Sequence, residues 1–368
     1  MSSPILPSAH YAEYLALDKV LNAQYPQSRK VGKEAHDEML FIIIHQVYEL
    51  WMKQILHELG RIQQAFIDDN LDECEISAVV HSLERIEKIL HLFIEQIGVL
   101  ETMTPMDFLE FRNYLIPASG FQSFQFRKIE TILGLKPPQR FAYGGKDYKE
   151  PFTPEEQAEL QSLESHPSLF DHIEAWLKRM PFLDTPHFNF LEHFRRAVSQ
   201  MMERDRNAIK QTPYLDMAEK NFRLEMLQQQ LTYYEAIFSP ERHTQLQQKG
   251  KIRLSHRALL AALMIYLYRD EPVLQQPYRL LADLMNIDEL LVLWRFRHAQ
   301  MVMRMLGYKM GTGGSSGYDY LMETVKRHAI FRDLMVINTF LVPRSVLPPL
   351  PMSLKETLNF HFAVDKSS

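Results

Sequence analysis

The stretch LDECEISAVVHSLERIEKILHLFIEQIGVL, residues 71–100, decides the fold class. Its apolar residues recur at steps of three and four, which places them in one stripe along a helix. The stripe consists of Ile76, Val79, Leu83, Ile86, Leu90, Phe93 and Ile97. The pattern predicts a long amphipathic helix whose apolar face packs against other helices.

The segments on either side of this stretch repeat the same period. In residues 36–67, one side of a helix would carry Leu40, Ile43, Ile44, Tyr48, Trp51 and Ile55. Further along, SHRALLAALMIYLYRDEP begins with a capping serine, Ser255, and the helical pattern stops before Pro272. No convincing run of alternating strand residues interrupts these patterns. The sequence therefore predicts an all-α fold with a helical bundle as its core.

Composition divides the helical pattern into unequal parts. Residues 135–157 are rich in proline, glycine and charged residues, which is typical of a surface connection. Residues 158–248 stay helical in pattern but are more polar than the segments around them. We therefore predict a helical core from residues 36–134 and 250–350, a connection and helical insert at 135–249, an N-terminal segment at 1–35 and a C-terminal tail at 351–368.

The overall composition narrows the class of protein. The chain has 368 residues, 46% of them hydrophobic, and its formal net charge of -5 without a basic block argues against nucleic acid as a partner. A single cysteine, Cys74, excludes an internal disulfide and metal sites built from several cysteines. The N-terminus lacks a signal-peptide pattern, and the longest strongly apolar run, residues 259–268, is well short of the ~20 residues that cross a bilayer. These features predict a cytoplasmic protein that does not enter a membrane.

Two histidines stand in apolar surroundings where a ligand could approach them. His45 follows four large apolar residues in FIIIHQVYELW, and it is either a core histidine with a hydrogen-bond partner or a side chain that faces a pocket. His298 lies in WRFRHAQMVMRMLG, where it suits an axial ligand of haem iron, because a neutral imidazole binds iron and soft apolar side chains pack the macrocycle. The alternative is a partly buried histidine on a basic helix. One helix face would carry Trp294, His298, Met301, Val302 and Met305.

Two further motifs could hold the charged groups of a small molecule. In DFLEFRNYLIPASGFQSFQFR, Phe108 and Arg112 lie one helical turn apart, a geometry that could clamp the carboxylate of an aromatic substrate. Arg112 could instead pair with a structural carboxylate such as Asp107. GTGGSSG, residues 311–317, has four glycines in seven residues. Its backbone N–H groups could bind a carboxylate or phosphate, or the motif could be an ordinary glycine-rich turn.

Taken together, these motifs are similar to those of one known family. The chain resembles the tryptophan 2,3-dioxygenases in the order and spacing of several blocks, among them HDEMLFIIIHQVYELWMKQILHEL, LETMTPMDFLEFRNYLIPASGFQSFQFR, RLSHRALLAALMIYLYRDEP, RFRHAQMVMRMLG and GTGGSSGYDYL. The resemblance covers residues 10–135 and 215–345. It implies an enzyme with haem b in a pocket between core helices. Such an enzyme cleaves the indole C2–C3 bond of L-tryptophan with O2 and gives N-formyl-L-kynurenine, the first step of the kynurenine pathway.

The resemblance also implies roles for individual residues. His298 would be the proximal ligand of the haem iron. His45 would lie on the distal side and accept a hydrogen bond from the indole N–H. Arg112 would form an ion pair with the substrate carboxylate, and Thr312 would contact the substrate ammonium and carboxylate groups.

The remaining implied residues form the walls of the active site. Within one chain, Phe41 and Phe108 would pack against the indole ring, and Ser119 and Gly120 would line the distal pocket. The family is a homotetramer, a dimer of dimers, in which the N-terminal segment completes the active site of a neighbouring subunit. In this chain that segment contains Tyr11, Tyr14 and Leu15.

Two other classes of function are compatible with parts of this pattern. A haem-dependent monooxygenase of a substituted indole or tryptophan could share the ligand and the pocket. A non-catalytic haem sensor or a helical interaction protein would not need an intact substrate clamp. The presence of Phe41, His45, Arg112 and Thr312 together favours the dioxygenase. Product mass separates the two enzymes, because one adds two oxygen atoms and the other adds one.

Overall fold

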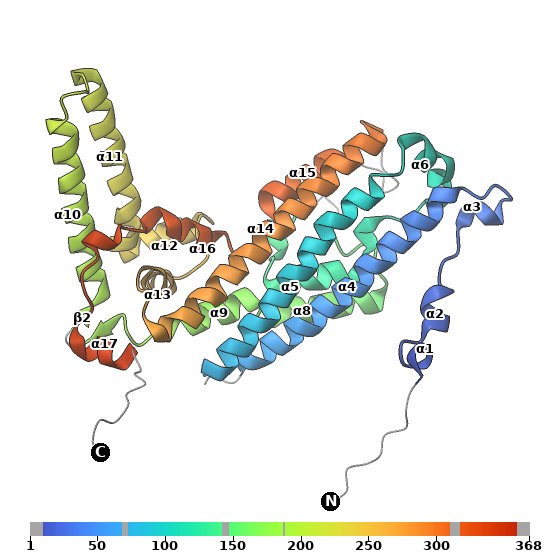
Figure 1. Ribbon diagram of the computed structural model, residues 1–368, viewed down its shortest axis with the longest axis horizontal. Helices are drawn as coiled ribbons and strands as arrows, with labels where there is room; N and C mark the ends of the chain where they lie inside the picture. The colour runs from blue at the N-terminus through green and yellow to red at the C-terminus, as the bar shows by residue number, and fades with distance from the viewer. Residues whose placement is uncertain (1–9, 68–72, 142–146, 187, 310–316, 359–368) are drawn as a thin grey trace, which may run out of the picture.

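The described part of the chain is almost entirely helical (Figure 1). The computed structural model describes residues 10–67, 73–141, 147–186, 188–309 and 317–358. Within these ranges the only strands are β1 (Asp184–Thr185) and β2 (Phe188–Asn189), a short antiparallel pair. The predicted all-α fold is therefore confirmed.

Three long helices form the centre of the bundle (Figure 1). α4 (His36–Ile67) packs along α5 (Glu73–Leu100), and α14 (Pro272–Leu306) packs along the same helix. All seven apolar residues of the predicted stripe in 71–100 are buried, with exposures between 0% and 6%. Because a fully buried aliphatic or aromatic side chain contributes ~1.5–3 kcal/mol, this stripe is a main source of the stability of the bundle.

The apolar face of α4 differs from the predicted stripe at one position. Ile44, Tyr48 and Ile55 are buried, whereas Ile43 is 42% exposed. Neighbouring residues on an α-helix point about 100° apart, so Ile43 and Ile44 do not both face the same core. Ile43 lies instead on the outer side of α4, as does Leu50.

Shorter elements close one end of the bundle. α6 (Pro105–Phe111) starts at a capping box, in which Thr104 and Asp107 each accept a hydrogen bond from the other's backbone N–H. The chain then passes through the short helices η1 (Arg112–Leu115) and η2 (Gly120–Gln122) into α7 (Phe124–Leu133), which packs against α4, and continues into η3 (Pro137–Gln139). α15 (Gly317–Arg327) lies along α14.

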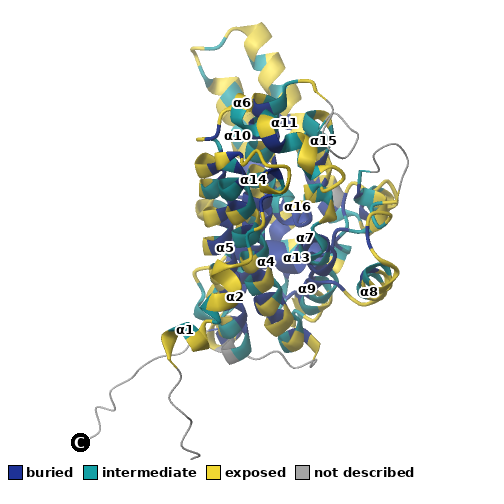
Figure 2. Cartoon of the chain, turned by 90° about the vertical axis from the view of Figure 1, so that its right-hand side faces the viewer, coloured by how far each residue is buried: buried dark blue, intermediate teal, exposed yellow. Residues whose placement is uncertain are grey.

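The insert and the C-terminal part extend the hydrophobic core in the other direction. One cluster of buried hydrophobic side chains runs from the central helices into the insert. In Figure 2, the residues coloured as buried lie toward the interior and the exposed residues lie around them. α10 and α11 form a hairpin that stands away from the bundle (Figure 1). The helices of this part are α8 (Pro154–Ser165), α9 (Leu169–Lys178), α10 (Phe190–Gln211), α11 (Met217–Phe238), α12 (Pro240–Gln248), α13 (His256–Leu267), α16 (Arg332–Val336), η5 (Ile337–Phe340), η6 (Arg344–Val346) and α17 (Met352–Leu358).

The N-terminal helices are attached to the bundle after α2, where the side chain of Gln46 on α4 accepts a hydrogen bond from Gln24 and donates one to the carbonyl oxygen of Ala23, and at α3. α1 (Tyr11–Tyr14) and α2 (Leu17–Leu21) bury no residue, and they lie below the bundle in Figure 1. α3 (Gln27–Lys30) is fixed by the buried carboxylate of Glu38, which accepts hydrogen bonds from the N–H groups of Gln27 at 2.7 Å and Ser28 at 2.9 Å. The chain is therefore anchored at α3, while α1 and α2 carry mostly exposed side chains.

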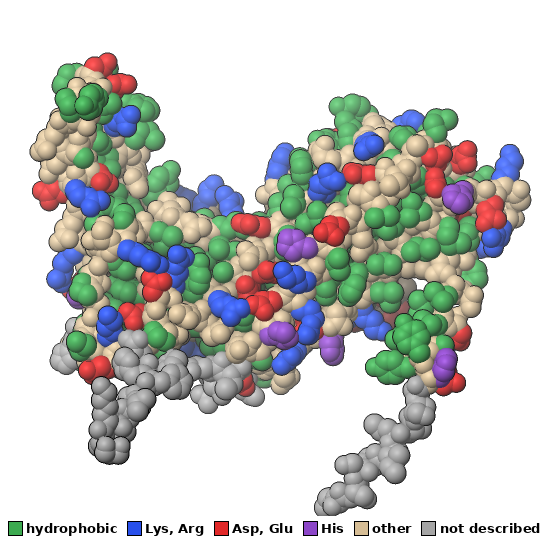
Figure 3. Space-filling view, in the orientation of Figure 1, with side chains coloured by type: hydrophobic (Ala, Val, Ile, Leu, Met, Phe, Trp, Pro, Cys, Tyr) green, Lys and Arg blue, Asp and Glu red, His purple; other side chains and the backbone are tan. Residues whose placement is uncertain are grey.

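The outer face of the three central helices carries exposed hydrophobic side chains. Figure 3 shows such side chains spread over α4 and α5. They include Ile43 and Leu50 on α4, Leu92 and Val99 on α5, and Leu293 and Phe296 on α14. None of the described helices combines the length and the hydropathy that a membrane span requires.

Candidate functional site

A cavity of about 280 Å³ lies among α4, α5, α6, α7, α14 and α15. Much of its wall is apolar, with Ile97 and Leu100 from α5 and Met301 and Met305 from α14. Polar and charged side chains also enter it, and they come from segments far apart in the sequence. A mostly apolar pocket with a few convergent polar groups is the usual form of a small-molecule site.

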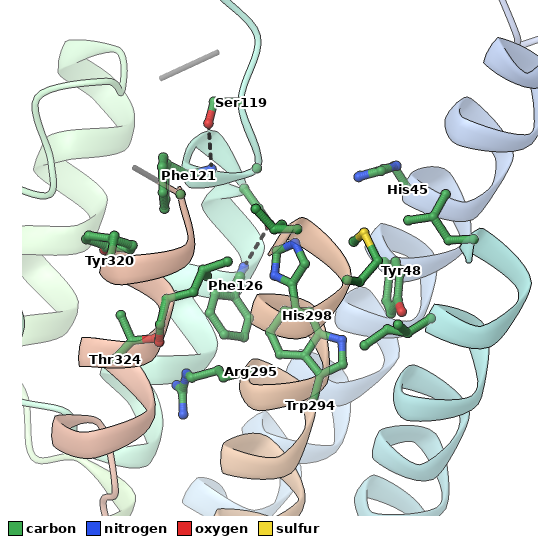
Figure 4. A pocket seen from close by; sticks show the side chains of 18 of the residues that line it. His45, Tyr48, Ser119, Phe121, Phe126, Trp294, Arg295, His298, Tyr320 and Thr324 are labelled. Carbon is green, nitrogen blue, oxygen red and sulfur yellow. Dashed lines mark hydrogen bonds between the residues drawn. The ribbon is translucent and has the colours of Figure 1, made fainter. Parts of the chain in front are cut away.

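His298 projects into this cavity from α14 (Figure 4). All five residues of the predicted face, from Trp294 to Met305, line the cavity, so the prediction that they share one side of a helix is confirmed. The indole of Trp294 stacks on the imidazole at 5.7 Å between ring centroids. Burial, followed by the nearby His45, lowers the pKa of His298 to about 4. The ring is therefore neutral near pH 7, with a nitrogen lone pair available.

His45 enters the cavity from α4 and has a defined tautomer. Its Nδ1 lies 2.6 Å from the carbonyl oxygen of Phe41, and a carbonyl only accepts hydrogen bonds, so Nδ1 carries the proton. Burial lowers the pKa of His45, although the bond to Phe41 and the charge of Glu49 act against it. The ring is neutral, and Nε2 is an acceptor. His45 thus has both features considered from the sequence, a hydrogen-bond partner and a place in a pocket.

Aromatic rings and one arginine stand beside His45. The ring centroids of Phe41 and Phe108 are 5.7 Å apart, and Phe41 also lies 4.2 Å from the imidazole of His45. Arg112 follows α6, and its backbone N–H donates to the carbonyl oxygen of Phe108. All four side chains line the cavity. The structure therefore brings together a flat apolar surface, a hydrogen-bond acceptor and a cation.

Ser119 and Gly120 also line the cavity, at the start of η2. The hydroxyl of Ser119 accepts a hydrogen bond from the backbone N–H of Phe121 at 3.4 Å. The backbone N–H of Ser119 donates to the side chain of Gln122 at 3.1 Å, and Ser119 and Gln122 form a capping box. Thr312, the other residue expected here, lies outside the described residues.

The N-terminal residues take no described part in the cavity of their own chain. Tyr11 and Tyr14 are on α1 and are 70% and 78% exposed, and Leu15 directly follows them at 39%. None of the three is among the described residues that line the cavity.

A buried cluster of charged residues borders the cavity, and the sequence analysis did not identify it. Glu130, on α7, accepts hydrogen bonds from Arg127 at 2.6 Å, Arg140 at 2.6 Å and Arg295 at 2.9 Å, and its carboxylate lies 3.4 Å from Nδ1 of His328. Burial alone would raise the pKa of Glu130, but the charges of the three arginines and the bond from His328 hold it well below its usual range. We name these five residues the Glu130 cluster.

His328 contributes to the Glu130 cluster as a neutral ring. The backbone N–H of Phe141 donates to its Nε2 at 3.1 Å, so the proton is on Nδ1, which faces Glu130. Burial lowers the pKa of His328, although the bond to Glu130 opposes this. The one sequence signal for the cluster was the spacing of Arg127 and Glu130, which lie three residues apart on a helix.

The donor set of the cavity fits a haem. His298 offers one neutral imidazole nitrogen, and the described residues contain no group of three or more His, Cys, Asp or Glu side chains that could hold a metal ion without a macrocycle. Methionine and aliphatic side chains near His298 suit a flat apolar ring system. The buried arginines of the Glu130 cluster suit a ligand that also carries negative charge.

Comparison with known proteins agrees with this chemistry. Residues 6–341 match the family described as Tryptophan 2,3-dioxygenase. A tryptophan 2,3-dioxygenase of Bdellovibrio bacteriovorus is 47% identical over 97% of this chain and 99% of its own length. The tryptophan 2,3-dioxygenase of Xenopus tropicalis is 46% identical over 95% of this chain and 86% of its own length. That of Dictyostelium discoideum is 43% identical over 96% of this chain and 89% of its own length. The chain belongs to the tryptophan 2,3-dioxygenase family.

Proposed function

We propose that the chain uses haem b and O2 to convert L-tryptophan to N-formyl-L-kynurenine, with both oxygen atoms entering the product. The family match supports this reaction. The observation that carries it to this chain is one cavity that contains His298, His45, Arg112 and two phenylalanine rings. These groups match an iron ligand, an acceptor for the indole N–H, a partner for the carboxylate and a surface for the indole ring.

His298 is the proposed axial ligand of the haem iron. Its low pKa keeps the imidazole neutral, which iron coordination requires, and the stacked ring of Trp294 restricts its rotation. Haem b, when bound, supplies the iron chemistry that makes O2 reactive toward the indole C2–C3 bond. The protein supplies the placement of the substrate.

His45, Arg112 and the two phenylalanines are the proposed substrate contacts. Nε2 of His45 accepts the indole N–H, because its Nδ1 is committed to Phe41. Arg112 pairs with the substrate carboxylate, and Phe41 and Phe108 pack against the indole. Two polar contacts and an apolar wall hold the substrate at three points, which fixes its orientation over the iron.

Three further assignments complete the proposed pocket. Ser119 and Gly120 form its distal wall at the start of η2. Thr312, in the glycine-rich motif of residues 311–317, is proposed to contact the ammonium and carboxylate groups of the substrate. We keep the predicted division into a haem-binding core of residues 36–134 and 250–350, a connection and insert at 135–249 and a tail at 351–368.

The chain is proposed to act in the cytoplasm as a homotetramer, a dimer of dimers. Two observations support association. Tyr11 and Tyr14 are exposed on a helix that buries no residue of its own chain, and Leu15 follows it. The outer face of α4, α5 and α14 carries exposed hydrophobic side chains. We propose that residues 1–35 complete the active site of a neighbouring subunit.

Isotope labelling tests the proposed reaction. Haem-loaded protein is mixed with L-tryptophan and ¹⁸O2, and the product is analysed by mass spectrometry. A product that gains two labelled oxygen atoms supports the dioxygenase. One labelled atom indicates a monooxygenase, and a change in the haem spectrum without any product indicates a sensor.

A further inference from the structure

A second, smaller cavity lies inside the bundle and has only apolar walls. Its volume is about 10 Å³, the space of one small molecule. Every described residue that lines it is an isoleucine, a leucine or a phenylalanine, and no polar atom of these residues faces the space. The same residues are between 0% and 7% exposed, so the cavity lies deep in the core. The sequence analysis did not identify it, because its walls are ordinary core residues.

The small cavity continues the large one along the same helices. On α4, Met52 lines the large cavity, and Ile55, less than one helical turn later, lines the small one. On α14, Trp294 lines the large cavity and Leu291 lines the small one. Both α5 and α7 also contribute residues to each cavity. The two spaces therefore lie end to end along the axis of the bundle.

Aromatic rings separate the two cavities. Phe126, on α7, lines both of them, so its ring is a shared wall. The ring centroid of Trp294 lies 5.1 Å from that of Phe126 and 5.7 Å from that of Phe93, which lines the small cavity. Figure 4 shows Trp294 below the imidazole of His298. The small cavity is thus one side chain away from the space that contains His298, and a change of rotamer at Phe126 can connect the two.

The walls of the small cavity suit an uncharged, apolar molecule of diatomic size. A buried water needs roughly two to four polar partners, which this cavity does not offer, so we expect it to stay dry. A charged group is excluded by the cost of its desolvation, and an indole ring is too large. O2 is apolar and small, and it gives up no strong hydrogen bond when it leaves water. It is the one component of the proposed reaction that fits.

We propose that the small cavity is a docking site for O2, from which the gas passes Phe126 into the cavity of His298. This inference rests on the proposed function, in which O2 is a substrate. A docking site in the core supplies O2 to the reaction space while L-tryptophan occupies the larger cavity. The alternative is a packing defect, which would take up no gas and would not affect the kinetics.

Xenon tests whether the small cavity takes up a gas, because it is an apolar atom only slightly larger than O2 and does not react. Crystals of the haem-loaded protein with bound L-tryptophan are exposed to xenon under pressure, and anomalous diffraction locates the xenon atoms. We expect one atom in contact with Ile55, Leu291 and Phe126. The bound L-tryptophan keeps xenon out of the substrate site, so this atom reports the small cavity alone.

Competition between the two gases tests the role in the reaction. Turnover is measured against the concentration of O2 at saturating L-tryptophan, with and without xenon. Xenon should raise the KM for O2 several-fold, because it occupies the docking site. The kcat at saturating O2 and the KM for L-tryptophan should stay unchanged, because the larger cavity is not altered.

Substitutions of Ile287 change the volume of the small cavity from α14 without touching the larger one. Ile287→Phe should fill the space, lose the bound xenon, raise the KM for O2 several-fold and remove any further effect of xenon. Ile287→Val should enlarge the space and bind xenon at lower pressure. The matched control is Ile62→Val, a buried position on α4 that is not among the described residues lining either cavity, and it should behave like the unaltered protein. If Ile287→Phe does not fold, Ile287→Val and the competition by xenon carry the test.

Three results would overturn the proposal. The first is the absence of xenon from the small cavity of the unaltered protein. The second is an unchanged KM for O2 when xenon or the ring of Ile287→Phe fills the cavity. The third is an equal rise in the KM values for O2 and L-tryptophan, which would indicate a general disturbance of the larger cavity. Failure of the proposed function is a separate outcome, because the labelled-oxygen experiment detects it whether or not xenon binds.

Discussion

Nδ1 of His45 lies 2.6 Å from the carbonyl oxygen of Phe41, one helical turn earlier, so the imidazole can offer only Nε2 to a ligand in the cavity. A neutral Nε2 accepts a hydrogen bond from a weak acid such as the indole N–H but does not readily remove its proton. We therefore expect that His45 orients the substrate and tunes the reaction.

His45→Ala should keep its haem and lose about tenfold to a hundredfold in kcat/KM for L-tryptophan, the cost of one buried hydrogen bond. It should also lose the preference for L-tryptophan over its N-methylated analogue, because neither can then donate to residue 45. The measurement is kcat/KM for both substrates in both proteins. A variant that binds haem and tryptophan but has no detectable turnover would identify His45 as an obligatory base.

His298→Ala should lose haem, or retain a haem that does not turn over, because His298 is the only imidazole among the described α14 residues that line the cavity. The haem content of the purified variant and its absorption spectrum measure this directly. His91→Ala, on the exposed side of α5, is the matched control and should retain both haem and activity. Normal haem content together with normal activity in His298→Ala would contradict the assignment.

Arg112→Gln should weaken binding of L-tryptophan by about 2–5 kcal/mol, the usual effect of breaking a desolvated ion pair. Tryptamine, which lacks the carboxylate, gives the matched comparison. The unaltered protein should prefer L-tryptophan strongly, and the variant should bind the two compounds with similar affinity. Binding titrations followed by the haem spectrum provide the affinities. Equal losses for both compounds would show that Arg112 supports the fold and does not contact the carboxylate.

Removal of residues 1–16 should lower activity while each subunit stays folded. Tyr11 and Tyr14 bury little surface within their own chain, and the anchor at Glu38, Gln27 and Ser28 is retained. Circular dichroism and thermal unfolding report the fold, and turnover reports the shared site. Full activity of the truncated chain as a monomer would rule out a role in a neighbouring subunit.

The stability of the chain should depend on the titration of Asp283, which faces Glu87 and Glu84 across α14 and α5. Burial, followed by the charges of these two glutamates, raises the pKa of Asp283 from 3.8 to about 7. The protonated form is therefore favoured in the folded state. Protonated Asp283 therefore stabilises the folded chain fully at pH values below the pKa that it has in the unfolded chain. This stabilisation is lost as the pH rises through the pKa that Asp283 has in the folded chain.

Asp283→Asn imitates the protonated side chain at every pH. Its free energy of unfolding should exceed that of the unaltered protein by an amount that grows between about pH 4 and about pH 8, to the order of 1–4 kcal/mol. Urea unfolding at several pH values measures this difference. Glu289→Gln, at an exposed position on the same helix, should show no such trend. A difference that does not change with pH would contradict the prediction.

The sequence predicted those features that repeat locally. The stripe in 71–100 and the face from Trp294 to Met305 follow the helical period, and burial enforces that period residue by residue. The exposure of Ile43 was missed, because an uninterrupted apolar run does not reveal where the stripe ends.

The Glu130 cluster could not be predicted in the same way. Glu130 and His328 alone are 198 positions apart, and each member of the cluster looks in the sequence like an ordinary surface residue. The proposed roles of His45, Arg112 and His298 came from the resemblance to the family, while the residues alone left alternatives open.

The ion pair between Glu130 and Arg295 joins residues that are 165 positions apart, and this separation sets an order on biosynthesis. At ~5–20 residues per second, α14 leaves the ribosome roughly ten to thirty seconds after α7. During that interval the nascent chain has one wall of the cavity and neither His298 nor Arg295. If His298 ligates haem as proposed, haem insertion follows the synthesis of α14 and the docking of that helix against α5.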